Sequence, residues 1–458
     1  MSLRLFGTDG IRGIPGRYPL TSEMVRRVGY AAATVLRRRR GEPARARNGS
    51  LPGILMGRDP RASGLGLMRQ LAQGMAKAGF AVLDAGIIPT AALAYLVPRR
   101  GALCGVMVSA SHNPAEFNGI KFFAGEGFKL SLETEREIED RLQDMPDPRG
   151  RPARLIADPA AERDYFDFLK STFPVNLDLS GVRLAVDCAN GSAYRVAPRL
   201  LRELGAEVFA IGCSPNGRNI NRGCGALDIR ALREEIRRRR CGCGAAFDGD
   251  ADRVIFADEE GAPCDGDVLL SMAATDLQER RALPGGKIAL TVMSNYGMIR
   301  FLEEGGIGAV QVPVGDRNVS EALDQEGLGL GGESSGHIIF RRFGPTGDGL
   351  LTALQILAIL VRSGLPLSRF RKRFQNYPQV LRSIRVENQV PLEEMPRLRR
   401  CIRDCERRLH GDGRVLVRYS GTEPLIRILV EGPDRRSIRR ISNEITETFL
   451  REIQAHVH

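Results

Sequence analysis

The chain of 458 residues contains no tryptophan, and only 6% of its residues are aromatic. It also has no uninterrupted apolar run of about 20 residues, the length that a transmembrane helix requires. The first residues, Met1 to Phe6, lack the basic-then-apolar pattern of a secretory signal. We therefore expect a large enzyme-sized protein that works in the cytoplasm and has no membrane partner.

The cysteines are not spaced in the regular pattern of a disulfide-bonded or zinc-binding protein. There are nine cysteines, so they cannot all pair within one chain. Cys241 and Cys243 have no second pair at the spacing of a zinc site. We expect reduced thiols that fill the core, without structural zinc or disulfides.

Acidic residues are fewer than basic ones, at 55 against 67, which gives a formal charge of +12. This excess, with the arginine runs 37–40 and 237–240, leaves a basic nucleic-acid-binding protein as an alternative of a different class. Both runs end amphipathic helical patterns, and neither has aromatic neighbours that would stack on bases. We favour solvated helix ends and expect no nucleic-acid partner, with the excess charge helping to attract phosphorylated substrates.

A serine stands in a polar turn directly after an apolar segment. The segment Cys104–Val108 reads as a strand, and Ser109–Pro114 (Ser-Ala-Ser-His-Asn-Pro) follows it. The hydroxyl of Ser111 is a weak nucleophile unless a neighbour activates it, and His112 and Lys121 are nearby polar candidates. His112 either orients Ser111, binds its phosphate, or makes a structural hydrogen bond within the turn.

Three acids follow a second apolar segment, Cys243–Phe247. They are Asp248, Asp250 and Asp252, and in an extended segment their side chains would share one face. Such an all-oxygen set favours Mg²⁺ shared with a substrate phosphate. The alternatives are an EF-hand loop, in which Arg253 occupies the position that needs glycine, and a solvated acidic turn.

Two further loops suit a phosphorylated polyol. Gly331–His337 supplies a carboxylate, two hydroxyls and an imidazole, and Glu333 would accept hydrogen bonds from two sugar hydroxyls. Arg418–Pro424 places a cation before a Ser-Gly-Thr turn whose backbone N–H groups would form an anion nest, and Arg427 adds a second guanidinium. Read singly, each loop is also compatible with an ordinary turn.

Apolar segments repeatedly give way to polar loops and then to helical patterns, for example at Ile54–Met56, Val182–Val186 and Ile288–Val292. This alternation predicts mixed sheets covered by helices. We expect joints between domains near residues 145–152, 258–261 and 363–367.

The four loops, in this order and spacing, resemble the α-D-phosphohexomutase family over nearly the whole chain. The resemblance is strongest to its phosphoglucosamine mutase branch, and six more motifs carry it: Phe6–Gly13, Gly57–Asp59, Ile87–Thr90, Asn118–Lys121, Val314–Arg317 and Thr346–Gly349. The resemblance implies three related mixed-sheet α/β domains, residues 1–152, 153–257 and 258–367, followed by a smaller α+β domain, residues 368–458. Each domain would carry one active-site loop.

The resemblance also implies a role for each loop. Ser111 would be the phosphorylated serine, and Asp248, Asp250 and Asp252 would hold Mg²⁺ together with an oxygen of the phosphoserine. Lys121 and His337 match positions of proton transfer or charge stabilisation. The residues implied to bind substrate are His112, Arg253, Glu333, Ser335, Arg418, Ser420, Gly421, Thr422 and Arg427.

The implied reaction interconverts glucosamine 6-phosphate and glucosamine 1-phosphate through a 1,6-bisphosphate, and feeds amino-sugar nucleotide and cell-wall precursor synthesis. Glucosamine or glucose 1,6-bisphosphate would act as activator, and a homodimer is compatible with the family. Position 334 is serine, where the branch usually carries glutamine and phosphomannomutases or phosphoglucomutases carry methionine. A phosphomannomutase/phosphoglucomutase therefore remains the alternative within the same chemistry.

Overall fold

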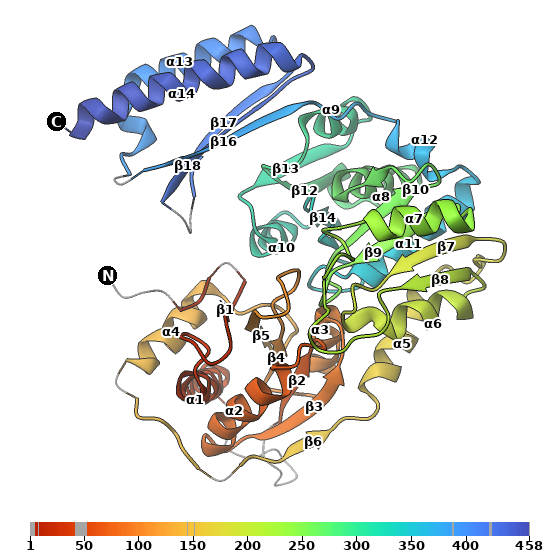
Figure 1. Cartoon of the computed structure of the whole chain (residues 1–458), viewed down its shortest axis with the longest axis vertical. Helices are drawn as coiled ribbons and strands as arrows, with labels where there is room; N and C mark the ends of the chain where they lie inside the picture. The colour runs from red at the N-terminus through yellow and green to blue at the C-terminus, as the bar shows by residue number, and fades with distance from the viewer. Residues whose placement is uncertain are drawn as a thin grey trace. The chain divides into compact units, whose positions relative to one another are not determined.

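The computed structural model describes residues 5–7, 9–41, 53–143, 145–150, 152–386, 389–420 and 424–457. The chain divides into two compact units (Figure 1). The first comprises residues 1–293 and 306–371, and the second comprises residues 294–305 and 372–458.

The first unit contains three sheets, of which the first is six-stranded with the order β1-β5-β4-β2-β3-β6. Its strands β2, β3, β4 and β6 run parallel, and β1 and β5 are antiparallel to their neighbours. Apolar residues of β2 and β4 are fully buried, as expected for central strands covered on both faces. The elements are β1 (Ile11–Gly13), α1 (Ser22–Arg40), β2 (Gly53–Arg58), α2 (Gly64–Lys77), β3 (Ala81–Ile87), α3 (Thr90–Arg99), β4 (Cys104–Val108), β5 (Asn118–Ala124), α4 (Leu132–Leu142) and β6 (Leu155–Ala157).

The second sheet has the order β11-β10-β9-β7-β8. Strands β7, β8 and β9 are parallel, and β10 returns antiparallel to β9. The elements are α5 (Ala161–Thr172), β7 (Arg183–Asp187), η1 (Ser192–Tyr194), α6 (Val196–Glu203), β8 (Glu207–Ile211), α7 (Arg230–Arg239), β9 (Cys243–Phe247), β10 (Val254–Asp258) and β11 (Pro263–Cys264).

The third sheet has the order β13-β12-β14-β15, with β15 antiparallel to β14. Helix α11 in this part is almost wholly apolar and buried, which holds it in the core of the unit. The elements are α8 (Gly266–Glu279), η2 (Pro284–Gly286), β12 (Lys287–Thr291), β13 (Gly308–Val312), α10 (Asp316–Gln325), β14 (Leu330–Gly332), β15 (Ile338–Phe340), α11 (Gly349–Ser363) and α12 (Leu367–Arg371).

The three sheets repeat one arrangement. In each, a parallel strand is followed by an antiparallel one, and these pairs are β4–β5, β9–β10 and β14–β15. The loop that joins each pair begins at the carboxyl end of the parallel strand, where open α/β sheets bind ligands. The predicted serine loop, acidic loop and sugar loop occupy these three equivalent positions.

The second unit is a three-stranded antiparallel sheet, β16-β18-β17, with helices α13 and α14. Its own apolar core includes Leu398, Ile428 and Phe449, all fully buried. The elements are α9 (Tyr296–Glu304), β16 (Gln379–Arg385), η3 (Leu392–Glu394), α13 (Pro396–Arg408), β17 (Arg414–Tyr419), β18 (Leu425–Glu431) and α14 (Arg435–Val457).

The predicted fold class is confirmed: mixed α/β sheets are followed by a smaller α+β part. The expected joint at residues 258–261 is the turn between β10 and β11 of one sheet, and residues 363–367 connect α11 to α12. Helix α9 groups with the second unit although its sequence neighbours belong to the first. The domain boundaries given above therefore stay predictions.

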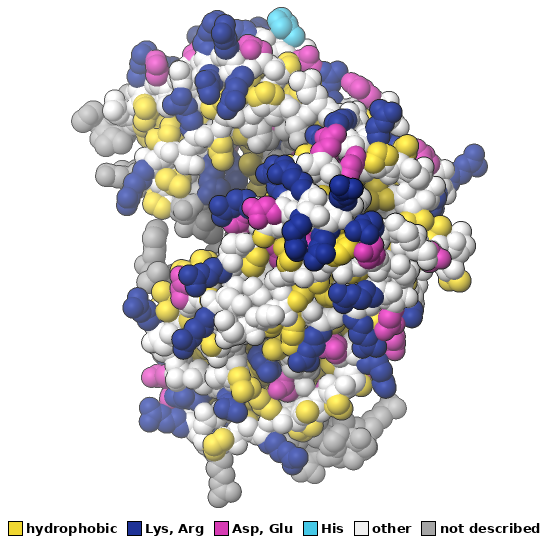
Figure 2. All heavy atoms as spheres, turned by 45° about the vertical axis from the view of Figure 1, so that its right-hand side comes forward, with side chains coloured by type: hydrophobic (Ala, Val, Ile, Leu, Met, Phe, Trp, Pro, Cys, Tyr) yellow, Lys and Arg dark blue, Asp and Glu magenta, His cyan; other side chains and the backbone are white. Residues whose placement is uncertain are grey.

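Both arginine runs lie at helix ends, as predicted, and their side chains bind the protein itself. In α1, Arg38 and Arg39 contact Glu137 of α4, and in α7 two arginines contact Glu235. Figure 2 shows Lys and Arg side chains over much of one face, with Asp and Glu side chains among them. Such interspersed charge is typical of a solvated surface. Within the described ranges, no helix is both long and apolar enough to cross a bilayer.

Candidate active site

The serine loop and the acidic loop meet in the structure. Ser111 is 1% exposed, and its Oγ donates a hydrogen bond to Asp248 Oδ2 at 2.5 Å. The two residues are 137 positions apart in the sequence, in loops that follow strands of different sheets. His112 lies beside them, with its Nδ1 3.4 Å from Ser111 Oγ. The nucleophile predicted from the sequence therefore faces the predicted metal ligands.

The three aspartates form one buried cluster. Asp248 and Asp250 are 0% exposed and Asp252 is 3% exposed, and their ligand atoms all lie within 4.8 Å of one another. Because the three side chains are almost completely shielded from water, the alternative of a solvated acidic turn is excluded. The EF-hand alternative is also unsupported, because Glu259 binds Ser368 instead of joining the cluster.

The carboxylates converge for a different reason from the one expected. They do not lie on an extended strand, because β9 ends at Phe247 and the acids occupy a turn. Ala251 has a φ of 57°, in the left-handed region, which reverses the chain between Asp250 and Asp252. Gly249 allows the close approach of the serine loop, since a Cβ there would lie 2.5 Å from Ser111 O. The expectation of strand alternation was therefore wrong, although the cluster it pointed to is present.

The cluster fits a hard divalent cation. Asp250 Oδ1 and Asp252 Oδ1 are buried without a hydrogen-bond partner, so they offer free lone pairs. Burial raises the pKa of Asp248 well above its usual value, and the neighbouring carboxylates of Asp252 and Asp250 raise it further. A bound cation would relieve this repulsion, and three carboxylate oxygens suit Mg²⁺.

Lys121 is a buried cation at the centre of the acidic groups. Its Nζ lies 2.9 Å from Asp250 Oδ2, 2.9 Å from Asp9 Oδ2 and 3.7 Å from Asp252 Oδ2. Burial lowers the pKa of Lys121, but these carboxylates outweigh it and hold the pKa well above its usual value. The Lys121 ammonium therefore keeps its positive charge beside the aspartate cluster.

His337 stands between two carboxylates. Its Nδ1 lies 3.6 Å from Asp252 Oδ2 and its Nε2 lies 3.8 Å from Asp316 Oδ2. Burial lowers the pKa of this imidazole, but Asp252, Asp316 and Glu333 raise it overall. Nε2 also accepts a hydrogen bond from Gly347 N at 3.2 Å, so a neutral ring carries its proton on Nδ1, towards Asp252.

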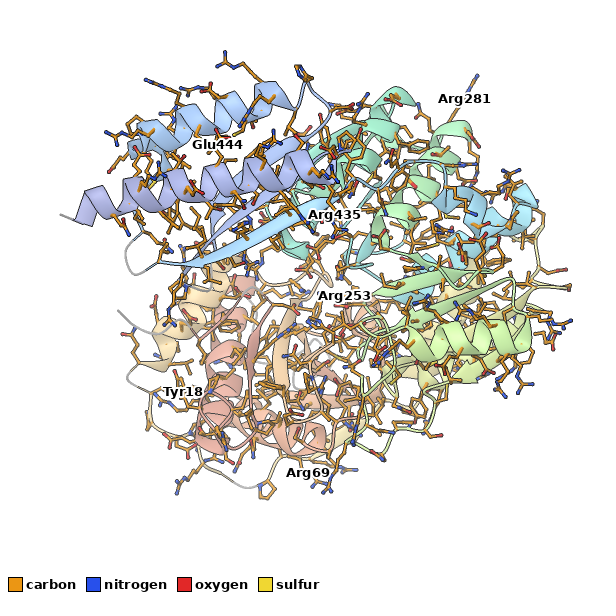
Figure 3. All side chains as sticks on the ribbon, turned by 45° about the horizontal axis from the view of Figure 1, so that its top comes forward. Tyr18, Arg69, Arg253, Arg281, Arg435 and Glu444 are labelled. Carbon is orange, nitrogen blue, oxygen red and sulfur yellow. The ribbon has the colours of Figure 1, made fainter. Side chains whose placement is uncertain are left out.

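The other predicted residues of the first unit also reach this region. Glu333 Oε1 accepts from Gly315 N at 3.1 Å, and Glu333 Oε2 accepts from Ser335 Oγ at 3.3 Å. Arg253 lies between β9 and β10, with its Nε 3.8 Å from Asp252 Oδ1 (Figure 3). The pKa of His112 is lowered to about 4 by burial and then by the positive charges of Arg253 and Arg12, so this ring is neutral at pH 7.

Several site residues were not predicted from the sequence. Thr90 Oγ1 donates to Asp250 Oδ2 at 2.6 Å, and Lys129 forms ion pairs with Asp9 and Asp316. Thr90, Asp9 and Asp316 stand in motifs that carried the resemblance, so a signal for them was present. Lys129 has no such motif, and only the folded contacts reveal it.

The phosphate loop belongs to the second unit. Arg418 of β17 and Arg427 of β18 are directly opposite each other in the sheet. Burial and then the charge of Arg427 lower the pKa of Arg418. Two guanidinium groups in opposite positions concentrate positive charge at this end of the sheet, which suits an anion. Ser420 is buried, and Gly421 and Thr422 lie outside the described residues.

Four family models match successive parts of the chain. They are described as phosphoglucomutase/phosphomannomutase α/β/α domain I over residues 3–148, domain II over residues 163–261, domain III over residues 265–377 and the C-terminal domain over residues 381–448.

Curated relatives match the chain from end to end. A phosphoglucosamine mutase of Rhizobium johnstonii is 45% identical over 456 residues, which is 98% of this chain and 98% of that protein. A phosphoglucosamine mutase of Syntrophotalea carbinolica is 42% identical over 461 residues, which is 99% and 98% of the two chains.

Solved structures share the fold at low sequence identity. A phosphoglucomutase/phosphomannomutase family protein of Burkholderia thailandensis has a TM-score of 0.79 at 23% identity, covering 97% of this chain and 96% of that one. The N-acetylphosphoglucosamine mutase of Aspergillus fumigatus, in complex with GlcNAc-6P and magnesium, has a TM-score of 0.66 at 17% identity, covering 97% and 95%. The chain therefore belongs to the phosphoglucomutase/phosphomannomutase family, and it contains all four domains of that family.

Proposed function

We propose that the protein is a phosphoglucosamine mutase, which interconverts glucosamine 6-phosphate and glucosamine 1-phosphate. The observation that carries this proposal is the contact of Ser111 Oγ with Asp248 inside a buried aspartate cluster. The relatives named phosphoglucosamine mutase, at 42 to 46% identity over nearly the full chain, support the choice of sugar.

In the first half-reaction, phosphorylated Ser111 transfers its phosphoryl group to the free hydroxyl of the sugar monophosphate. The Oγ–P bond breaks, a P–O bond to the sugar forms, and the proton lost by the sugar hydroxyl is balanced by the proton gained on Ser111 Oγ. The product is a 1,6-bisphosphosugar.

Asp248, Asp250 and Asp252 would hold Mg²⁺ together with an oxygen of the phosphoserine. The bound ion would neutralise charge on the transferring phosphoryl group. The magnesium in the complex of the A. fumigatus protein supports this assignment. The two unpartnered carboxylate oxygens are the groups available for it.

The remaining charged residues stabilise the transfer from fixed positions, as phosphoryl transfer requires. Lys121 supplies a permanent positive charge, and Arg253 sits beside the transferring group. His337 holds or releases a proton at Nδ1, which faces Asp252. His112, neutral at pH 7, donates a hydrogen bond to the phosphate.

The second half-reaction returns the other phosphate of the bisphosphosugar to Ser111. The intermediate must therefore turn end for end, and one distal site must accept either phosphate. Arg418, Ser420, Gly421, Thr422 and Arg427 form that site. The opposed pair Arg418 and Arg427 supports this role, since two neighbouring guanidinium groups can bind one phosphate.

Glu333 and Ser335 recognise the sugar, and Ser334 between them is the position that separates the branches of the family. The alternative within the same chemistry is a phosphomannomutase/phosphoglucomutase. For a nucleic-acid-binding protein the support is weaker, because the arginine runs bind the protein's own groups. Glucosamine or glucose 1,6-bisphosphate would keep Ser111 charged.

The proposal extends to the organisation of the protein. Four domains, residues 1–152, 153–257, 258–367 and 368–458, each supply one loop. The enzyme acts in the cytoplasm, where it feeds amino-sugar nucleotide and peptidoglycan precursor synthesis, and a homodimer is compatible with this role.

The test is a Mg²⁺-dependent mutase assay with glucosamine 6-phosphate, glucose 6-phosphate and mannose 6-phosphate, each with a trace of glucose 1,6-bisphosphate. We expect the highest kcat/KM for glucosamine 6-phosphate. A preference for a neutral hexose would keep the chemistry and reject the sugar, whereas no turnover of any of the three would reject the mutase.

A further inference from the structure

A buried arginine lies behind the serine loop. Arg61 follows the end of β2, and its side chain and that of Asp59 are both 0% exposed. Strands β2 and β4 are parallel neighbours, so the residues after each strand meet at one edge of the sheet. Arg61 thereby reaches the loop that follows β4.

Every N–H group of this guanidinium has a partner. Nε donates to Asp59 Oδ2 at 2.9 Å. The four remaining N–H groups donate to four backbone carbonyls of the serine loop, namely those of Ser111 at 2.9 Å, Asn113 at 2.8 Å, Phe117 at 3.0 Å and Pro114. A lysine has at most three donors and no fork geometry, so it cannot replace this set.

The same ion pair also fixes the amide of Ser111. Asp59 Oδ2 accepts a hydrogen bond from Ser109 Oγ at 2.6 Å, and Ser109 Oγ accepts one from Ser111 N at 2.9 Å. The carbonyl of Ser111 is therefore bound to Arg61 directly, and its N–H is bound to Asp59 through Ser109. Both backbone groups of the reacting residue depend on one buried pair.

The backbone of Ser111 needs such support. Its φ is 51°, in the left-handed region, which is unfavourable for a residue with a side chain. Conformations of this kind persist only where the surroundings over-determine them. Asn221 adds to the support from the second sheet, since its Nδ2 donates to Ser111 O at 2.9 Å.

We propose that Arg61, paired with Asp59, is the positioning residue that holds Ser111 in its strained backbone conformation and so aims its Oγ at the aspartate cluster. All its N–H groups are used on Asp59 and on backbone carbonyls, so it acts on the hydroxyl only through the backbone. The proposal rests on the proposed function in one respect, that Ser111 is the group phosphorylated.

The test compares Arg61→Lys with Arg100→Lys. Arg100 is the control, because its guanidinium also forms ion pairs in the first unit, with Asp158 and Asp164, away from the serine loop. The rate of phosphoryl transfer from glucose 1,6-bisphosphate to Ser111 is followed by intact-protein mass, well below the Tm of each variant. We expect Arg61→Lys to slow this transfer about 10- to 100-fold, as a small misplacement does. Arg100→Lys should lower Tm and leave the rate unchanged.

A purely structural role predicts a different pattern. Folded Arg61→Lys protein would then show a lower Tm with the transfer rate of the wild type, and that result would overturn the proposal. If Arg61→Lys does not fold, Ser109→Ala provides the test. This variant removes only the hydroxyl through which Asp59 is connected to Ser111 N. We expect slower transfer in this variant also, and an unchanged rate would reject the proposal.

Hydrogen exchange of the Ser111 amide separates this inference from the proposed function. We expect faster exchange at this amide in Arg61→Lys and Ser109→Ala, but not in Arg100→Lys. This holds whether or not Ser111 accepts a phosphoryl group. Loss of mutase chemistry in the wild type would reject the function alone, whereas wild-type amide exchange in both loop variants would reject the role of Arg61.

Discussion

The serine loop and the acidic loop occupy the same place in two related sheets, yet their polar groups are satisfied in opposite ways. Four backbone carbonyls of the serine loop accept hydrogen bonds from one protein side chain, that of Arg61. In the acidic loop, Asp250 Oδ1 and Asp252 Oδ1 are buried without a hydrogen-bond partner. Carboxylate oxygens of this kind are the donors that Mg²⁺ prefers. One loop is held by the protein's own donors, and the other presents carboxylate oxygens that suit a cation.

The loop that follows a parallel strand, β4 or β9, can therefore be adapted to two different functions. A loop that carries a covalently modified residue must be rigid before the reaction, and direct hydrogen bonds provide that rigidity. A loop that binds a metal must keep lone pairs free for the ion. The variants described below change the serine loop and the acidic loop one at a time.

Ser111→Ala removes the reacting hydroxyl and should have the largest effect. We expect mutase activity to fall by more than about 10⁴-fold, because no phosphoenzyme forms. The aspartate cluster is intact in this variant, so Mg²⁺ affinity measured by calorimetry should remain close to that of the unphosphorylated wild type. Substantial activity in a folded Ser111→Ala protein would reject the covalent role.

Asp250→Asn should weaken the metal site and leave the serine loop in place. Losing one charged ligand should raise the Mg²⁺ concentration for half-maximal activity by roughly 100-fold. Asp187→Asn is the matched control, because Asp187 is equally buried but binds only backbone amides, of Gly225 at 2.7 Å and Ala189 at 2.9 Å. It should cost stability, about 1–3 kcal/mol, without changing the Mg²⁺ titration.

Thr90→Val tests whether the hydrogen bond that orients Asp250 contributes to Mg²⁺ affinity, and its effect should be smaller than that of Asp250→Asn. Valine keeps the shape of threonine but removes the hydrogen bond from Oγ1 to Asp250 Oδ2. We expect Mg²⁺ affinity to fall about tenfold, as for other groups that orient a ligand. An unchanged titration with an unchanged Tm would show that Asp250 needs no such orientation.

Ser334→Gln should have the smallest effect, because it alters the sugar loop and neither of the two compared loops. Side-chain contacts of this kind discriminate substrates by roughly 10-fold. We expect the ratio of kcat/KM for glucosamine 6-phosphate over glucose 6-phosphate to change by no more than this, with the Mg²⁺ titration unaltered. Ser334→Ala provides the control for loss of the hydroxyl alone.

Much of the site could be predicted from sequence because each loop is a short local run after an apolar strand. Ser111, the three aspartates, Glu333 and His337 were all found in this way, and the structure brings them together. The mixed α/β fold followed from the same alternation of strands and helices. Local sequence patterns therefore identify the polar residues of the loops that follow the strands.

The residues that hold the loops could not be predicted in this way. Arg61 contacts Ser111 across 50 positions and Asn221 contacts it across 110, so no local pattern marks either one. The extended geometry expected of the aspartates was wrong because the left-handed Ala251 folds them into a turn. The placement of α9 in the second unit likewise depends on contacts distant in the sequence.

The central claim is that Ser111 carries the phosphoryl group between substrate molecules. The most direct test incubates the protein with Mg²⁺ and ³²P-labelled glucose 1,6-bisphosphate, maps the labelled peptide, and then adds unlabelled glucosamine 6-phosphate. The account predicts label on Ser111 that moves to the sugar upon addition. Label on another residue, or label on Ser111 that stays there when the sugar is added, would contradict it.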